Sequence, residues 1–225
     1  MAPHKVNEWF EIRTEKLNDK DHHVAYASQH IPPGTLILSE KLFFETLGPP
    51  RGTPYTQYQD FNKRLDKLGR DQLKNMNHAV SATHDEDWHQ LFDILHRNAI
   101  AVDDHLLLFL YQSTFSHSCS PHAECTWNPS KERCEILVHR QVEAGNKICV
   151  SHLLNQDLLE AREERRQKIE KKLKIHCECE ACHISSSSDS DDRRDKIRQY
   201  LSKPESMVSF TNQYSRGKHH LDLAD

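Results

Sequence analysis

Four cysteines have the type and spacing of a metal site. Cys177, Cys179 and Cys182 lie within one six-residue stretch, and Cys119 lies far upstream. So short a stretch cannot orient three thiols into sensible disulfide pairs. Three closely spaced thiolates with one distant thiolate make the tetrahedral four-sulfur set that structural Zn²⁺ prefers. We therefore predict one structural zinc, and the alternative is a cluster of buried or idle thiols.

The segments that carry these cysteines resemble motifs of the SET-domain protein lysine methyltransferases, especially the SMYD-like and related fungal SET proteins. The core motif of that family, Asn-His-Ser-Cys-x-Pro-Asn, is matched by residues 116–122, which read Ser-His-Ser-Cys-Ser-Pro-His. The post-SET motif, Cys-x-Cys-x-x-Cys, is matched by residues 177–182. The resemblance implies that the motif cysteine and the post-SET cysteines share one zinc. It also implies an S-adenosylmethionine-dependent lysine methyltransferase as the parent activity.

The chain departs from this family at positions that bind the cofactor or orient the nucleophile. The family has Gly-x-Gly where the backbone must approach S-adenosylmethionine closely, and residues 22–24 here read His-His-Val. The two asparagines of the core motif are Ser116 and His122, and the catalytic tyrosine is His152. We expect S-adenosylmethionine to bind poorly or not at all, with any contact made by the backbone of Ser116 and His117. Methyl transfer depends strongly on near-attack geometry, so it should be impaired.

Histidine occupies three of the altered positions. If His22, His122 and His152 line the former pocket, they form an imidazole cluster. An unperturbed histidine has a pKa near about 6.5, so it can both accept and donate a proton at cellular pH. We name these three as candidate catalytic residues, with His152 as the acid/base element. The cluster could also bind a second metal, and the alternative is that the rings only fill space or face solvent.

Three classes of function stay open. The first is a SET fold that has lost lysine methylation and whose pocket performs other chemistry, such as cyclisation or isomerisation of a small molecule. The second is a divergent protein-lysine N-methyltransferase. The third is a non-catalytic module that binds a peptide or protein partner in the former substrate groove. Fold analogy alone does not choose among them.

The composition of the chain limits the classes of partner that we expect. The 225 residues carry a net charge of −4 with both signs intermixed, so we expect no nucleic-acid partner. No apolar run approaches the length of a membrane span, and no leader pattern is visible, so we expect no membrane partner. Seven cysteines without such a leader fit a reducing compartment, and we expect an intracellular protein of the cytoplasm or nucleus. The ligand would be a small-molecule substrate, or a peptide or protein.

The pattern of elements predicts an α+β fold that is mainly β. Short strands flank the turn at residues 31–34, and residues 123–139 read as a hairpin. The resemblance makes this a SET-domain fold of several small sheets, with a helical insert at about residues 49–100 and a zinc-binding post-SET segment.

The C-terminal third reads as helical and polar. Asp157 is the expected N-cap of a charged helix that ends at about Lys174. Residues 185–192 form a serine and aspartate tract, which predicts a flexible linker or a phosphorylation target before a short helix at residues 193–201. We therefore predict a SET domain with its post-SET segment at residues 8–183, and a linker and tail at residues 184–225.

Overall fold

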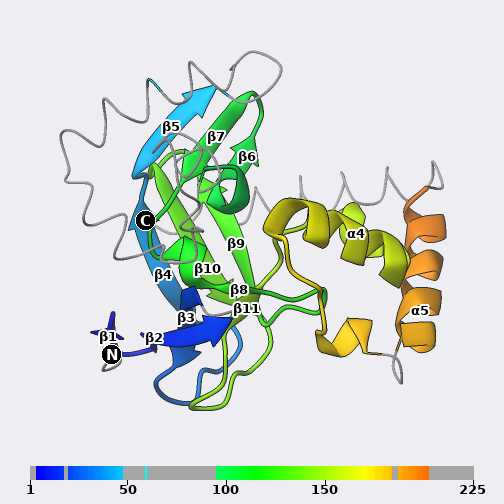
Figure 1. Ribbon diagram of the computed structural model, residues 1–225, viewed down its shortest axis with the longest axis horizontal. Coiled ribbons are helices and arrows are strands. Elements are labelled where there is room, and N and C mark those ends of the chain that lie inside the picture. Colours follow the sequence, from blue (N-terminus) through cyan, green and yellow to red (C-terminus); the bar gives the residue numbers. More distant parts are fainter. Residues whose placement is uncertain (1–3, 18–19, 48–58, 60–94, 184–186, 203–225) are drawn as a thin grey trace, which may run out of the picture. The chain divides into compact units, whose positions relative to one another are not determined.

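The computed structural model describes residues 4–17, 20–47, 59, 95–183 and 187–202 (Figure 1). By its internal contacts the chain divides into two compact units, residues 1–152 and residues 153–225. This division falls earlier in the chain than the domain boundary predicted at residue 183. The described part of the chain contains no helix that is long and apolar enough to cross a membrane.

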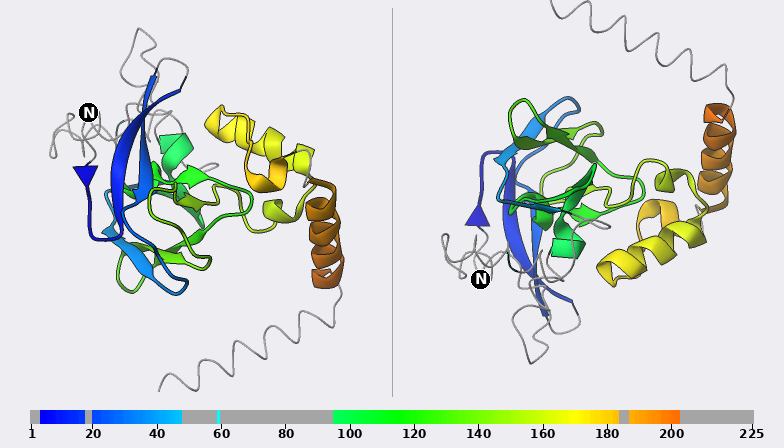
Figure 2. Two further views of the ribbon diagram at one scale, coloured as in Figure 1. Left: turned by 90° about the horizontal axis from the view of Figure 1, so that it is seen from below. Right: turned by 90° about the horizontal axis from the view of Figure 1, so that it is seen from above.

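The first unit is built from small β-sheets, as predicted (Figures 1 and 2). The first sheet has the order β1 (His4–Lys5), β2 (Phe10–Leu17) and β3 (Lys20–Ala27). The second has the order β4 (Leu36–Lys41), β10 (Arg133–Val138) and β9 (Ala123–Asn128). The third has the order β5 (Phe44–Leu47), β7 (His105–Leu108) and β6 (Ile100–Val102). These three sheets are antiparallel, and β8 (Ser116–His117) and β11 (Cys149–Val150) form a parallel pair.

Alternation along the strands determines which face of the second sheet is buried. In β10, Cys134, Ile136 and Val138 are fully buried, whereas the side chains between them are more exposed. This period of two is what a half-buried strand requires. The turn before β4 uses Gly34 at φ +85°, a left-handed conformation that glycine adopts without steric cost. The predicted turn at residues 31–34 and the hairpin at residues 123–139 are therefore both present.

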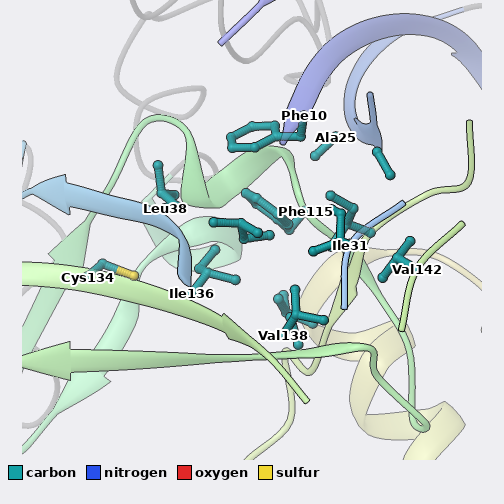
Figure 3. Packing of buried hydrophobic residues seen from close by; sticks show 14 of the residues in the cluster. Phe10, Ala25, Ile31, Leu38, Phe115, Cys134, Ile136, Val138 and Val142 are labelled. Carbon is teal, nitrogen blue, oxygen red and sulfur yellow. The ribbon is translucent and has the colours of Figure 1, made fainter. Parts of the chain in front are cut away.

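The core of the first unit joins buried residues between Phe10 and Leu38 to others between Leu107 and Val150 (Figure 3). Phe10 from β2 packs against Phe115 with the rings tilted and their centroids 5.1 Å apart. Ile31, Ile136 and Val138 are each fully buried in the same cluster. Because Phe115 directly precedes β8, this packing anchors the start of the core motif.

The predicted helical insert lies largely outside the described residues. Its described end, residues 95–98, is helical, and β6 begins at Ile100. Leu95 is buried with Phe44 and Leu108 in a second, smaller apolar cluster.

The second unit contains η2 (Asp157–Leu159), α4 (Arg162–Leu173), η3 (Glu180–Cys182) and α5 (Ser187–Leu201). The prediction of one helix from Asp157 was wrong at its start. Asp157 opens the short 3₁₀ turn η2, and its carboxylate accepts a 2.6 Å hydrogen bond from Lys168. The backbone is extended at Glu160 and Ala161, so α4 begins only at Arg162.

The serine and aspartate tract is more ordered than predicted. Residues 187–192 form the first turns of α5, so a flexible linker is wrong for this part of the tract. The reason is a tertiary contact that composition does not reveal. The Asp191 carboxylate accepts hydrogen bonds from the backbone N–H of Arg162 at 3.0 Å and from the Arg165 guanidinium at 2.8 Å.

Candidate functional site

The core-motif segment is held against β11, which ends two residues before His152. Strands β8 and β11 pair Ser116 with Cys149 and His117 with Val150 in parallel register. Beyond β8, the Ser118 N–H donates to the Val150 carbonyl at 2.9 Å. Two segments more than thirty residues apart in sequence therefore lie side by side. This pairing positions two of the residues singled out by the sequence, His117 and His152.

His117 and His152 contact each other through a directed hydrogen bond. The His152 backbone N–H donates to Nδ1 of His117 at 3.1 Å, and the two ring centroids lie 6.0 Å apart in an edge-on arrangement. A ring nitrogen that accepts carries no proton, so neutral His117 has its proton on Nε2. That Nε2 lies 3.3 Å from Sγ of Cys119. His117 therefore joins the end of β11 to the motif cysteine.

The His152 ring is oriented by a backbone carbonyl. Its Nε2 lies 2.9 Å from the carbonyl oxygen of Phe115. A carbonyl only accepts, so Nε2 of His152 is the protonated, donating nitrogen. In the neutral ring this leaves Nδ1 as the nitrogen that can accept a proton. The side chain is half-buried.

Hydrogen bonds of its main chain hold His122 in place. Its N–H donates to the Cys149 carbonyl at 2.9 Å, and its own carbonyl accepts from the N–H groups of His139 and Arg140 at 3.0 and 3.1 Å. It thus closes the motif segment against β11 and against the residues that follow β10.

The residues at the lost Gly-x-Gly position lie in a different sheet. His22, His23 and Val24 sit inside β3, which pairs with β2 along its whole length. His22 lies opposite Glu15, and Nδ1 of His23 lies 3.3 Å from the Thr14 hydroxyl. Val24 is buried. These contacts bring together His117, His152 and Cys119, whereas His22 belongs to the β2–β3 hairpin.

Three of the predicted zinc ligands gather in the second unit. The sulfur atoms of Cys177, Cys179 and Cys182 lie within 4.8 Å of one another. In a tetrahedral Zn²⁺ site with Zn–S bonds near 2.3 Å, sulfurs are about 3.8 Å apart, so this spacing suits such an ion. The structure thus contains a cysteine cluster that could hold a metal. Cys119, the fourth predicted ligand, is almost fully buried in the first unit.

Two arginines of α4 hold the backbone around this cluster. Arg166 donates to the carbonyls of Cys177 at 3.0 Å and of Cys182 at 2.9 Å. Arg165 is fully buried, and it donates to the Ala181 carbonyl at 3.1 Å and lies 4.0 Å from Sγ of Cys182. A guanidinium at that position favours a thiolate over a thiol. Partners that orient metal ligands in this way are usual around metal sites.

The role of Arg165 was missed from sequence, although a signal existed. Arg165 lies four residues before Ile169, so both side chains share one face of the helix. Both residues are fully buried. Arg165 therefore lies on the inner face of a helix whose other charged residues are mostly exposed or half-buried.

A second missed residue, Glu40, fixes the chain that enters the motif. Its carboxylate accepts the backbone N–H groups of Leu110, Tyr111 and Gln112 at 2.7, 2.9 and 2.9 Å. Burial raises the pKa of Glu40, and the three backbone hydrogen bonds oppose that rise. The carboxylate thereby sets the position of η1 (Gln112–Thr114), which leads directly into Phe115 and β8.

Comparison with known proteins assigns the family. The family model for the SET domain matches residues 22–153, more than half of the chain, so this protein belongs to the SET-domain family. The histone-lysine N-methyltransferase set5 of Schizosaccharomyces pombe is 24% identical over 181 residues, which cover 77% of this chain and 52% of that protein. Human N-lysine methyltransferase SMYD2 is 21% identical over 226 residues, covering 88% of this chain and 50% of that protein.

The chain therefore spans about half the length of the relatives it matches. Among solved structures, a Plasmodium falciparum protein described as a histone methyltransferase overlaps 66% of this chain and 96% of its own at 12% identity. Its TM-score is 0.37, too low to add to the family assignment.

Proposed function

We propose that this protein is a divergent protein-lysine N-methyltransferase in which His152 takes the place of the family's tyrosine. The observation that carries the proposal is the pairing of β8 with β11, which places His152 against the core motif. Kinship with two lysine methyltransferases, set5 and SMYD2, supports the reaction class. It was the second of the three classes that the sequence left open.

In this methyl transfer, His152 would accept a proton from the lysine ammonium. A lysine ammonium has no lone pair, so it must lose a proton before its nitrogen can be methylated. With Nε2–H directed to the Phe115 carbonyl, Nδ1 of His152 is the ring nitrogen that would accept this proton. The backbone N–H to His117 and the carbonyl of Phe115 fix the ring, so little reorganisation is needed when a proton arrives.

S-adenosylmethionine, when bound, would supply the methyl group. On this chain Ser116 and His117 are the residues proposed to hold it, since both lie on β8 beside β11 and both are half-buried. The β3 side offers His22 and Val24 in a regular strand where the family has glycines. Contacts on that side are therefore weaker, and we expect lower affinity than in relatives that keep the glycines.

Calorimetric titration with S-adenosylmethionine, paired with transfer of radiolabelled methyl groups to histone and lysine peptides, tests the proposal. We expect measurable binding and a transfer rate that rises with pH through the histidine range. The His152→Ala variant should lose at least about tenfold in rate, and His152→Tyr should lose that rise with pH. His139→Ala is the matched control, because His139 is an exposed histidine of the same unit. Failure to bind the cofactor at millimolar concentration would rule out methyl transfer.

A second candidate function is a SET fold with a repurposed pocket. Histidines at positions 22, 122 and 152 in place of glycine, asparagine and tyrosine favour it. Here His152, with His122 or His22, is the proposed acid/base element of a non-methylating reaction on a small molecule. Absence of cofactor binding together with a bound metabolite in the purified protein would support this candidate. Absence of both would favour a module that binds a peptide or protein partner.

We also propose that Cys119 completes a four-sulfur zinc site with Cys177, Cys179 and Cys182. The donor chemistry of four thiols that could hold a metal supports this assignment. His117, with its Nε2–H directed to Sγ of Cys119, would stabilise that sulfur as a thiolate. Metal analysis should find one zinc per chain, and Cys119→Ser should weaken its retention against a chelator at least tenfold. A zinc stoichiometry near zero would refute the site.

A further inference from the structure

Two cysteines outside the proposed zinc set contact each other. Sγ of Cys125 in β9 lies 2.8 Å from Sγ of Cys134 in β10. The strand register pairs Cys125 with Ile136 and Cys134 with Trp127, so the two cysteines are diagonal neighbours on one face of the hairpin. A disulfide has an S–S distance of about 2.05 Å. The two sulfurs therefore need to approach by less than about 1 Å to bond.

We propose that Cys125 and Cys134 form a reversible redox pair, which a hydroperoxide converts into a disulfide that cross-links β9 to β10. The inference is independent of methyl transfer and of the zinc site.

The burial of the two thiols assigns them different roles. Cys125 is partly exposed, so a small oxidant in solvent reaches it first. Cys134 is fully buried in the central strand of its sheet, between β4 and β9. The hydrogen bond with Cys125 and burial raise the pKa of the Cys134 thiol, and the charges of Glu40 and Glu135 add to the rise. Cys134 therefore stays protonated and inert until its neighbour is oxidised.

The reaction balances with one molecule of hydrogen peroxide. The Cys125 thiolate attacks one peroxide oxygen, the O–O bond breaks, and hydroxide leaves as Cys125 becomes a sulfenic acid. The Cys134 sulfur then attacks the sulfenic sulfur, forming the S–S bond and breaking the S–O bond. The thiol proton of Cys134 and the departing hydroxyl leave as water. Two thiols have then lost two electrons to the peroxide, and a dithiol such as dithiothreitol reverses the change.

Titration of the full, zinc-loaded chain with hydrogen peroxide, followed by non-reducing peptide mass spectrometry, tests the proposal. We expect a linked peptide joining Cys125 to Cys134 that disappears with dithiothreitol, at peroxide concentrations that leave the zinc content unchanged. The oxidised chain should melt about 5 °C higher than the reduced chain, because the bond constrains the unfolded state. If alkylation after denaturation finds both thiols still reduced until zinc is released, or if Cys125 proceeds to a sulfinic acid without linkage, the proposal is wrong.

Single variants separate the two roles without depending on the linked product. In Cys134→Ala, Cys125 should stop at the sulfenic acid, which dimedone traps. In Cys125→Ala, Cys134 should stay reduced over the same range, since it is buried. Cys149→Ser is the matched control and should form the linked peptide as the unaltered chain does. Equal peroxide reactivity of Cys134 with and without Cys125 would overturn the assignment of roles.

Discussion

The two units of this protein are stabilised by different kinds of interaction. The first unit has a continuous apolar core that includes Phe10, Phe115 and Ile136. In the second unit, the largest fully buried side chain of the described residues is a charged one, Arg165. Large apolar residues of α5, such as Ile197 and Tyr200, are about half exposed. Hydrophobic burial can therefore fold the first unit, whereas the second depends on directed hydrogen bonds and, we propose, on a metal.

Among the predicted changes, removal of the metal should produce the largest difference in stability between the two units. Structural zinc in small domains contributes on the order of 10 kcal/mol of folding free energy. Treatment with a chelator, or the change Cys182→Ser, should therefore raise amide hydrogen exchange throughout α4, η3 and α5. Amides of the β4–β10–β9 sheet should keep their protection. Cys149→Ser should behave like the unaltered chain, and equal loss of protection in both units would show that they do not differ as described.

The converse change removes apolar packing from the first unit. Ile136→Ala leaves a cavity in a fully buried position and should cost about 3–4 kcal/mol in the free energy of unfolding. Denaturant titration followed by tryptophan fluorescence measures it, because Trp127 belongs to this sheet. Leu137→Ala is the control in the next position, where the side chain is 45% exposed, and should cost less than about 1 kcal/mol. Similar losses for the two variants would contradict a one-sided core.

The buried guanidinium tests the second unit without touching a cysteine. Arg165→Met keeps much of the side-chain volume but leaves the Asp191 carboxylate and the Ala181 carbonyl without this donor. We expect a loss of about 3 kcal/mol in the stability of the second unit. Arg198→Met breaks an exposed pair with Asp195 and should change stability by less than about 0.5 kcal/mol. Thermal unfolding of both variants, with zinc content measured in parallel, makes the comparison.

The smallest expected effect is a dependence on acid. Burial raises the pKa of Asp191. The hydrogen bond from the Arg162 N–H and the contacts with Arg165 lower it by more, so this pKa lies below its ordinary value. A lowered folded-state pKa means that the carboxylate stabilises the fold above its unfolded pKa of about 3.9. That contribution is lost as pH falls through the folded value.

Comparison with Asp191→Asn isolates this contribution, since acid also removes zinc from both proteins alike. We expect the unaltered chain to be more stable by about 1 kcal/mol at pH 7. The difference should shrink below about pH 4. A gap that is constant down to pH 2 would show that the charge of Asp191 contributes nothing.

The same contrast explains what could be predicted from the sequence. The turn at Gly34 and the hairpin around residues 129–132 carry local signals, because turn residues and alternation act over a few positions. The SET fold and the three clustered cysteines followed from short motifs. These features fall mostly where apolar pattern or a compact motif determines structure.

Elements that depend on distant polar contacts were mispredicted. Nothing local to the serine and aspartate tract indicates that Asp191 meets Arg162 and Arg165, and that contact accompanies a helix where composition suggests a linker. The His152 tautomer depends likewise on the Phe115 carbonyl, far away in sequence. The catalytic roles of His22, His122 and His152 stay predictions, as does the domain boundary at residue 183.

The carboxylate of Glu40 has a consequence for how this fold can change length. In the sequence, Glu40 comes before residues 48–94, and the three residues whose N–H groups it binds come after them. Between these points, β5 and β7 pair Leu47 with His105. The intervening chain therefore starts and ends at a closed stem, and each doubling of its length costs only about 0.6 kcal/mol in closure entropy. The segment between Leu47 and His105 can therefore be lengthened, shortened or replaced while β8, β11 and His152 keep their positions.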